Sequence, residues 1–185
     1  LSALKHPMAS GGMVRVQFKS LVRKLEQSIL RGPRPAPGIE GLRLAMEEEE
    51  KTSNELIQLI NIIEHAACDM DNLLNKPTAS LWDLVRAHIS LVEALAATNL
   101  DAGATQIWAG DSGEGLAGFT AELLQHALVI TEIEPGTYPA LLDGLMTGRA
   151  VRSRYGLHPR IFIWGLMEAR LQRTDLVILG GLNEG

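Results

Sequence analysis

Apolar residues recur every three or four positions along most of the chain, which is the spacing of amphipathic helices. The pattern predicts helices over residues 1–8, 13–30, 39–46, 56–74, 81–95, 116–127 and 138–146. The two central helices have matched periods and are joined by a turn containing Pro77, so we expect an antiparallel hairpin. Its first helix should bury a heptad-like seam of Leu56, Ile60, Ile63, Ala67, Met70 and Leu74.

Glycine and proline separate these helices. Three prolines within residues 33–37 fix φ and remove backbone donors, so Gly32–Gly38 should be a stiff, extended connector. Pro135-Gly136 breaks the chain again, and Gly148 is expected to end the last helix.

Capping patterns locate several helix starts. Thr52-x-x-Glu55 and Asp111-x-x-Glu114 have the spacing of a capping box, and Ser80 offers a further cap. Between them, Thr98–Gly110 should be a loop that holds one short strand at Thr105–Trp108.

The stretch from residue 151 to residue 185 has a different pattern. Ile161–Trp164 and Leu176–Leu179 are short apolar runs, each followed by glycine, as in buried parallel strands. The connection Gly165–Asp175 is long enough for one short helix, so a β-α-β unit is predicted. Ligands of open α/β sheets lie beyond the carboxyl ends of the strands, which directs attention to residues 165–170 and 180–185.

Two segments here, His158–Leu171 and Asp175–Gly185, resemble the AddB subunits of AddAB helicase-nucleases, in their alphaproteobacterial form. Leu4–Ala9 is similar to the segment that begins the second insertion of that family, so the resemblance spans the whole chain, with specific motifs only at its two ends. One residue departs from the pattern, since Leu166 stands where proline is expected.

This resemblance implies a mainly α fold in two parts. Residues 1–150 would be a helical insertion domain like the 2B domain of superfamily 1 helicases, and residues 151–185 would start a truncated RecA-like core. Glu168 and Arg170 would lie near a motif that couples nucleotide to single-stranded DNA, and Asn183 and Glu184 would end the next strand. The full set of family-motif residues is Glu168, Arg170, Gly180, Gly181, Asn183, Glu184 and Gly185.

The parent complex implied by the resemblance resects double-strand breaks for recombination. It would pair this chain with an AddA-like helicase subunit and with DNA, and it would use ATP, Mg²⁺ and an iron–sulfur cluster. The 185 residues contain no nucleoside-triphosphate loop, nuclease carboxylate set or cysteine quartet. We therefore expect an internal fragment without catalysis or cofactor, which the start at Leu1 and the end at Gly185 also suggest.

The composition bears on disulfide bonds, on the cellular compartment and on membrane insertion. The single Cys68 excludes an internal disulfide and an all-cysteine cluster, and a reducing cytoplasm fits. No run of 18 apolar residues is present, so no membrane span is expected.

Charge is strongly segregated, although the net charge is only −5. Residues 1–35 carry +6, residues 36–147 carry −14 and residues 148–185 carry +3. Five arginines near the C-terminus are candidate contacts to DNA phosphates: Arg149, Arg152, Arg154, Arg160 and Arg170. The alternative for this arginine segment is an ordinary solvated linker. Two other functions stay open for the chain as a whole: a docking module that uses the helical seams and, with the least support, a nucleotide-dependent α/β enzyme.

Three other patterns carry little chemistry. Glu47–Glu50 points four carboxylates in different directions around a helix, which does not form a cation site. His65-x-x-Cys68 lacks the second ligand pair of a zinc site. Gly110-x-x-Gly113-x-Gly115 lacks the order and the lysine of a phosphate loop, so a helix start is expected there.

Overall fold

The computed structural model describes residues 1–47, 53–130, 132–151 and 160–180. The chain divides into two units, Leu1–Arg152 and Ser153–Gly185, and each is described by itself. The protein is 61% helix, and its described residues form no sheet, which confirms the prediction of a mainly α fold. No helix in these residues is long and apolar enough to cross a membrane.

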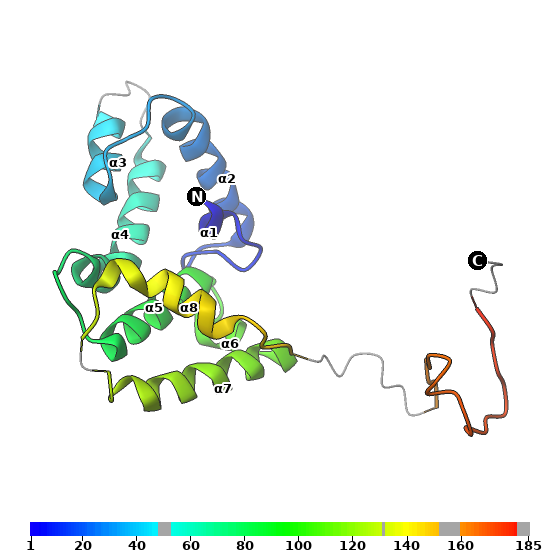
Figure 1. Ribbon diagram of the computed structural model, residues 1–185. Coiled ribbons are helices and arrows are strands. Elements are labelled where there is room, and N and C mark those ends of the chain that lie inside the picture. Colours follow the sequence, from blue (N-terminus) through cyan, green and yellow to red (C-terminus); the bar gives the residue numbers. More distant parts are fainter. Residues whose placement is uncertain (48–52, 131, 152–159, 181–185) are drawn as a thin grey trace. The chain divides into compact units, whose positions relative to one another are not determined.

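Every helix that the described residues form lies in the first unit. In chain order they are α1 (Ser2–Lys5), α2 (Arg15–Leu25), the π-helix η1 (Glu26–Leu30), α3 (Gly38–Glu47), α4 (Asn54–Leu74), α5 (Leu81–Ala96), α6 (Gly103–Ile107), α7 (Gly110–Ala127), the 3₁₀ turn η2 (Pro135–Thr137) and α8 (Tyr138–Met146). Figure 1 shows α1, α2 and α3 beside the N-terminal half of α4, with α5 to α8 grouped beside its other end. The predicted hairpin of α4 and α5 and the exact extent of α8 are confirmed.

Helix starts follow side-chain capping in two cases. Ser80 caps α5 as predicted, and its hydroxyl accepts a hydrogen bond from the Asp83 amide. The cap of α4 is Ser53, which accepts from the Leu56 amide, so the prediction of Thr52 as the cap is one residue too early. Helix α7 begins at Gly110, so Asp111 lies in its first turn, where its charge favours the positive end of the helix.

One hydrophobic core lies between α2, α3 and α4. Phe18, Leu59 and Ile60 are fully buried at its centre. The remaining buried members are Ala9, Leu21, Val22, Leu25, Ile29, Met46 and Leu56. The amphipathic pattern of residues 13–30 therefore places the predicted apolar face inward, and the Pro-rich connector then carries the chain to α3.

A second core lies between α5, α7 and α8. Its buried residues are Ala79, Leu81, Leu84, Val85, Phe119, Leu123, Ala127 and Tyr138. The C-terminal half of α4 also contacts this core through Met70 and Leu73. Since α4 is a single helix of 21 residues that takes part in both cores, it joins the two halves of the unit.

The predicted seam of α4 fails at its last residue. Leu56 and Ile60 are buried and Met70 packs against the second core, but Leu74 is 44% exposed and Leu73 packs in its place. Leu74 lies about five turns after Leu56 and shares its face. The second core contacts a different side of α4, and a single heptad pattern does not describe a helix that has two neighbours on different faces.

The loop after α1 attaches α2 to the end of α5. The amides of Ser10 and Gly11 both donate to the Leu95 carbonyl, at 2.8 and 2.9 Å, and the Gly12 amide donates to the Ala97 carbonyl at 2.7 Å. A β-carbon at Gly11 would lie 2.9 Å from the Phe18 ring, and the φ of Gly11 is +53°. Glycine is therefore needed where the loop crosses the core.

The predicted strand at Thr105–Trp108 is wrong, because residues 103–107 form helix α6. A β-carbon at Gly103 would overlap the Glu93 carbonyl, so the start of α6 lies directly against the backbone of α5. The Trp108 indole Nε1 also donates to Glu93 Oε1 at 2.6 Å. These tertiary contacts outweigh the β propensity of this short segment.

The described residues of the second unit do not form the predicted β-α-β unit. Residues 162–165 and 176–180 have no strand pairing, and residues 166–171 form turns instead of a helix. Two short apolar runs alone do not make a stable sheet, because each strand needs hydrogen-bonded neighbours and a covered face. The described residues supply neither.

Candidate nucleic-acid interface

Arg149 packs against the unit that carries it. Its guanidinium Nη2 lies 2.9 Å from Glu122 Oε2, and its Cζ lies 4.7 Å from the centre of the Phe119 ring. Both partners belong to α7, whereas Arg149 follows α8. An ion pair and a cation–π contact thus fasten the end of α8 onto α7, and the charge of Arg149 is partly neutralised there.

Glycines of α7 make room for this arrangement. A β-carbon at Gly115 would lie 2.7 Å from Val151 Cγ2, so the segment after α8 lies directly on the helix surface. A β-carbon at Gly113 would overlap the backbone of Trp108, which leads into α7. Gly113 and Gly115 therefore serve close packing, whereas Gly110, with a φ of +69°, begins the helix, and the expected helix start is confirmed.

The other predicted DNA contacts lie elsewhere in the chain. Arg160 and Arg170 are exposed residues of the second unit. Arg152 and Arg154 lie outside the described residues. Arg149 belongs to the first unit.

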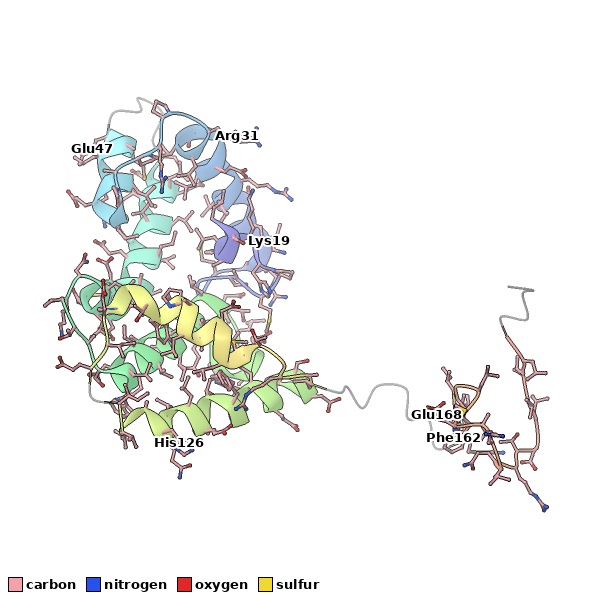
Figure 2. The ribbon with its side chains drawn as sticks, in the orientation of Figure 1. Lys19, Arg31, Glu47, His126, Phe162 and Glu168 are labelled. Atoms are coloured by element: carbon pink, nitrogen blue, oxygen red, sulfur yellow. The ribbon has the colours of Figure 1, made fainter. Side chains whose placement is uncertain are left out.

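The family-motif residues form a tight turn. The Ala169 amide donates to the Gly165 carbonyl at 3.0 Å, and the Glu168 carboxylate folds over Gly165, where a β-carbon would meet it. Phe162 and Glu168 of this unit are labelled in Figure 2. Just before the turn, the Phe162 and Trp164 rings stack with centres 5.4 Å apart.

The remaining motif residues add little geometry. Gly180 is described and has open space at its α-carbon. Gly181, Asn183, Glu184 and Gly185 lie outside the described residues. The predicted ligand edge at residues 180–185 is therefore represented by Gly180 alone.

An apolar cavity of about 210 Å³ lies between α5, α6, α7 and α8. Its one polar pair joins His88 Nδ1 and Tyr138 Oη, 3.0 Å apart, with the two rings edge to face. Burial lowers the pKa of His88 below its usual range and raises the pKa of Tyr138 to about 12. Both groups are therefore neutral near pH 7, which suits a structural hydrogen bond inside a core.

These two pKa shifts predict that the folded state is most stable near neutral pH and loses stability at both acid and alkaline pH. The folded state resists protonation of His88, so unfolding should become easier as the pH falls below about 6.5. It also resists ionisation of Tyr138, so stability should fall again as the pH rises from about 10 to about 12. Urea unfolding midpoints across pH 5–11 measure both effects, and Tyr138→Phe should reduce the alkaline loss. An alkaline loss of equal size in Tyr138→Phe would assign it to other groups.

A polar cleft of about 420 Å³ lies between α4 and α5. Its charged side chains have mixed signs, since Asp69 and Asp83 stand beside Lys76 and Arg86. Arg86 also lies 4.5 Å from the centre of the Trp82 ring. A cleft whose acids and bases alternate has no net preference for an anion or a cation.

The metal candidate around His65 does not assemble. His65 and Cys68 are exposed, and Cys68 Sγ accepts a hydrogen bond from Asn72 Nδ2 at 3.5 Å. The nearby Glu64 is engaged by Arg43. Within the described residues, no three His, Cys, Asp or Glu side chains are placed to hold a metal ion together.

No family model, curated protein or solved structure matches this chain. The candidate interface therefore depends on its residues alone. The pairs Glu122–Arg149 and His88–Tyr138 were missed by sequence reasoning, because their members are 27 and 50 residues apart on different helices and share no periodicity.

Proposed function

We propose that this chain is a non-catalytic region of a double-strand break repair helicase-nuclease subunit, and that it supports DNA binding and end resection for homologous recombination. The likeness of His158–Leu171 and Asp175–Gly185 to AddB subunits supports this proposal. On this proposal, residues 1–150 are the helical insertion and residues 151–185 start the RecA-like core. ATP, Mg²⁺ and an iron–sulfur cluster would be bound elsewhere in the parent complex, which an AddA-like subunit would complete.

One observation carries the proposal. Ten large apolar side chains of the second unit are exposed: Ile161, Phe162, Ile163, Leu166, Met167, Leu171, Leu176, Val177, Ile178 and Leu179. Residues that would stabilise a core by about 25 cal/mol for each Å² buried are left in water here. The two runs have the composition of inner strands, and a sheet supplied by the rest of a RecA-like core would cover them.

The exposed arginines of this second unit are the proposed contacts to DNA. Arg160 and Arg170 flank the turn that holds Glu168, and Arg152 and Arg154 precede them in the sequence. Glu122 and Phe119 already hold the guanidinium of Arg149, which weakens the case for Arg149 as a phosphate contact. Guanidinium groups suit phosphate, since they donate paired hydrogen bonds to its oxygens.

Binding of fluorescent single-stranded and tailed DNA to the 185-residue chain tests the proposal. If about three to five phosphates are neutralised, affinity for a single strand should fall roughly 20- to 100-fold between 50 and 200 mM salt. Arg160→Gln with Arg170→Gln should weaken binding and reduce the salt dependence. Arg149→Gln is a single-charge control, since it removes one positive charge from a residue that Glu122 already neutralises, and it should change binding less. Absence of binding at 20 mM salt would contradict a DNA role for this chain.

A second function, docking of a partner subunit, has its own observation. Apolar residues of α4 and α5 such as Leu59 and Leu84 are packed in the two cores, whereas Leu74 of the predicted α4 seam is 44% exposed. Leu128 and Val129, at the end of α7, are 70% and 81% exposed. If DNA binding fails, this short apolar end and the exposed runs of the second unit are the surfaces that favour a protein partner.

A further inference from the structure

Helix α2 and the first turn of η1 carry a stripe that contains cations and no acid, and that is exposed except at the half-buried Lys19. Its residues are Val16, Lys19, Ser20, Arg23 and Gln27, which follow one another at helical spacing and are called the α2 stripe below. They lie opposite the buried side of the helix, where Phe18, Leu21 and Leu25 enter the first core. Lys19 is labelled in Figure 2.

The acids around the α2 stripe are already engaged by other cations. Glu26 lies 2.7 Å from Lys5 Nζ and 3.9 Å from Arg31 Nη2. The hydrogen bond from Lys5 and the charges of Lys5 and Arg31 lower the pKa of Glu26, so it is ionised and engaged at neutral pH. Glu55 is likewise held by Lys24 at 2.9 Å.

Lys19 and Arg23 are the two cations of the α2 stripe. No carboxylate in the described part of the chain lies within ion-pairing distance of either side chain. They are one helical turn apart, about 6 Å along the axis. Ser20 and Gln27 stand beside them with neutral hydrogen-bonding groups. Within the described residues, the stripe therefore offers positive charge that no carboxylate neutralises.

The side chains of the α2 stripe suit binding to a nucleic-acid backbone better than binding to a membrane surface. Side chains of Lys, Arg, Ser and Gln are those that contact phosphate and sugar in protein–DNA complexes. Adsorption to a lipid surface needs an apolar helix face against the acyl chains. That face of α2 is buried in the first core, and Val16 is the one apolar residue of the stripe, at 77% exposure.

We propose that the α2 stripe is a second contact to the DNA backbone, separate from the arginines of residues 149–170. The inference rests on the proposed function, because it takes DNA as the polyanion, and it deepens that function by assigning a surface to the helical unit. Backbone contacts carry no sequence information, so the stripe should bind DNA of any sequence.

The test compares two double variants of the 185-residue chain that lose the same charge. Lys19→Gln/Arg23→Gln removes both cations of the stripe, whereas Lys76→Gln/Arg86→Gln removes two cations beside Asp69 and Asp83 in the mixed cleft. The slope of log affinity against log salt should decrease by about 1.4 for single-stranded DNA, or about 1.8 for duplex, in the stripe variant. The control should keep the slope of the unmodified chain, and circular dichroism should show equal helix content in all three proteins.

Each outcome decides something. An unchanged slope in the stripe variant, with clear binding by the unmodified chain, overturns this inference and leaves the proposed function standing. An equal loss in the control shows a net-charge effect and also overturns it. No DNA binding by the unmodified chain in low salt overturns both, as does adsorption to vesicles of anionic phospholipid in place of DNA.

Discussion

Replacing Phe18 with alanine is expected to lower the free energy of unfolding of the helical unit by about 3–5 kcal/mol. The Phe18 ring is fully buried at the centre of the first core, next to the loop at Gly11. Its removal loses the transfer free energy of the ring and leaves a cavity. The surrounding α2 and α4 are held by several other contacts and relax only in part.

Urea unfolding followed by circular dichroism measures this effect. Val16→Ala is the matched control, because Val16 lies on the same helix and is 77% exposed. It should change the free energy of unfolding by less than about 0.5 kcal/mol. A Phe18→Ala loss as small as that of the control would show that the first core does not stabilise the unit.

Because both cores share helix α4, the loss of stability in Phe18→Ala is expected to affect both of them. Leu59 of α4 packs in the first core and Leu73 packs against the second, with no break in the helix between them. Unwinding α4 would therefore expose both cores. We expect a single transition in which Phe18→Ala also destabilises the second core, since neither half keeps its packing without this helix.

Helix positions were predictable because they depend on local pattern. Residues 138–146 carry an apolar period between a Pro-Gly break and a glycine, and α8 occupies those residues. Ser80 precedes Asp83 at cap spacing, and the predicted hydrogen bond is present. In such cases the signal and its physical cause lie within a few neighbouring residues.

The errors occur where distant segments decide the structure. Leu73 replaces Leu74 in the core because the second core lies on another side of α4. Ile161–Trp164 has the composition of a strand, but strand pairing needs a neighbour, and residues 162–164 have no strand pairing. The composition of a segment shows that it can form a strand, but it does not show whether a neighbouring strand is present to pair with it.

The candidate site shows the same division. The basic character of residues 148–160 was evident, but the neutralisation of Arg149 by Glu122 was not, because that ion pair joins two helices. The α2 stripe was visible only as part of a basic helix. Its distinction from the neighbouring Lys24 depends on the position of Glu55 on α4, which the structure supplies.

Gly103→Ala is expected to destabilise the helical unit by about 3 kcal/mol, a large effect for one added methyl group. The new β-carbon would overlap the carbonyl of Glu93 and lie 2.9 Å from the Ala97 amide nitrogen. Both are backbone atoms of the last turn of α5, so a side-chain rotation does not relieve the overlap. Helix α6 would have to move away, and the hydrogen bond from Trp108 Nε1 to Glu93 would be lost with it.

Gly118→Ala supplies the opposite expectation for the same chemical change. Gly118 lies within α7, and nothing stands within 4 Å of a β-carbon built there. Alanine should therefore stabilise the protein by up to about 1 kcal/mol through its higher helix propensity. Urea unfolding followed by tryptophan fluorescence and circular dichroism compares the two variants. Opposite signs would show that α6 is fixed by close contact with α5, whereas stabilisation by both would mean that α6 is free to move from α5 at little cost.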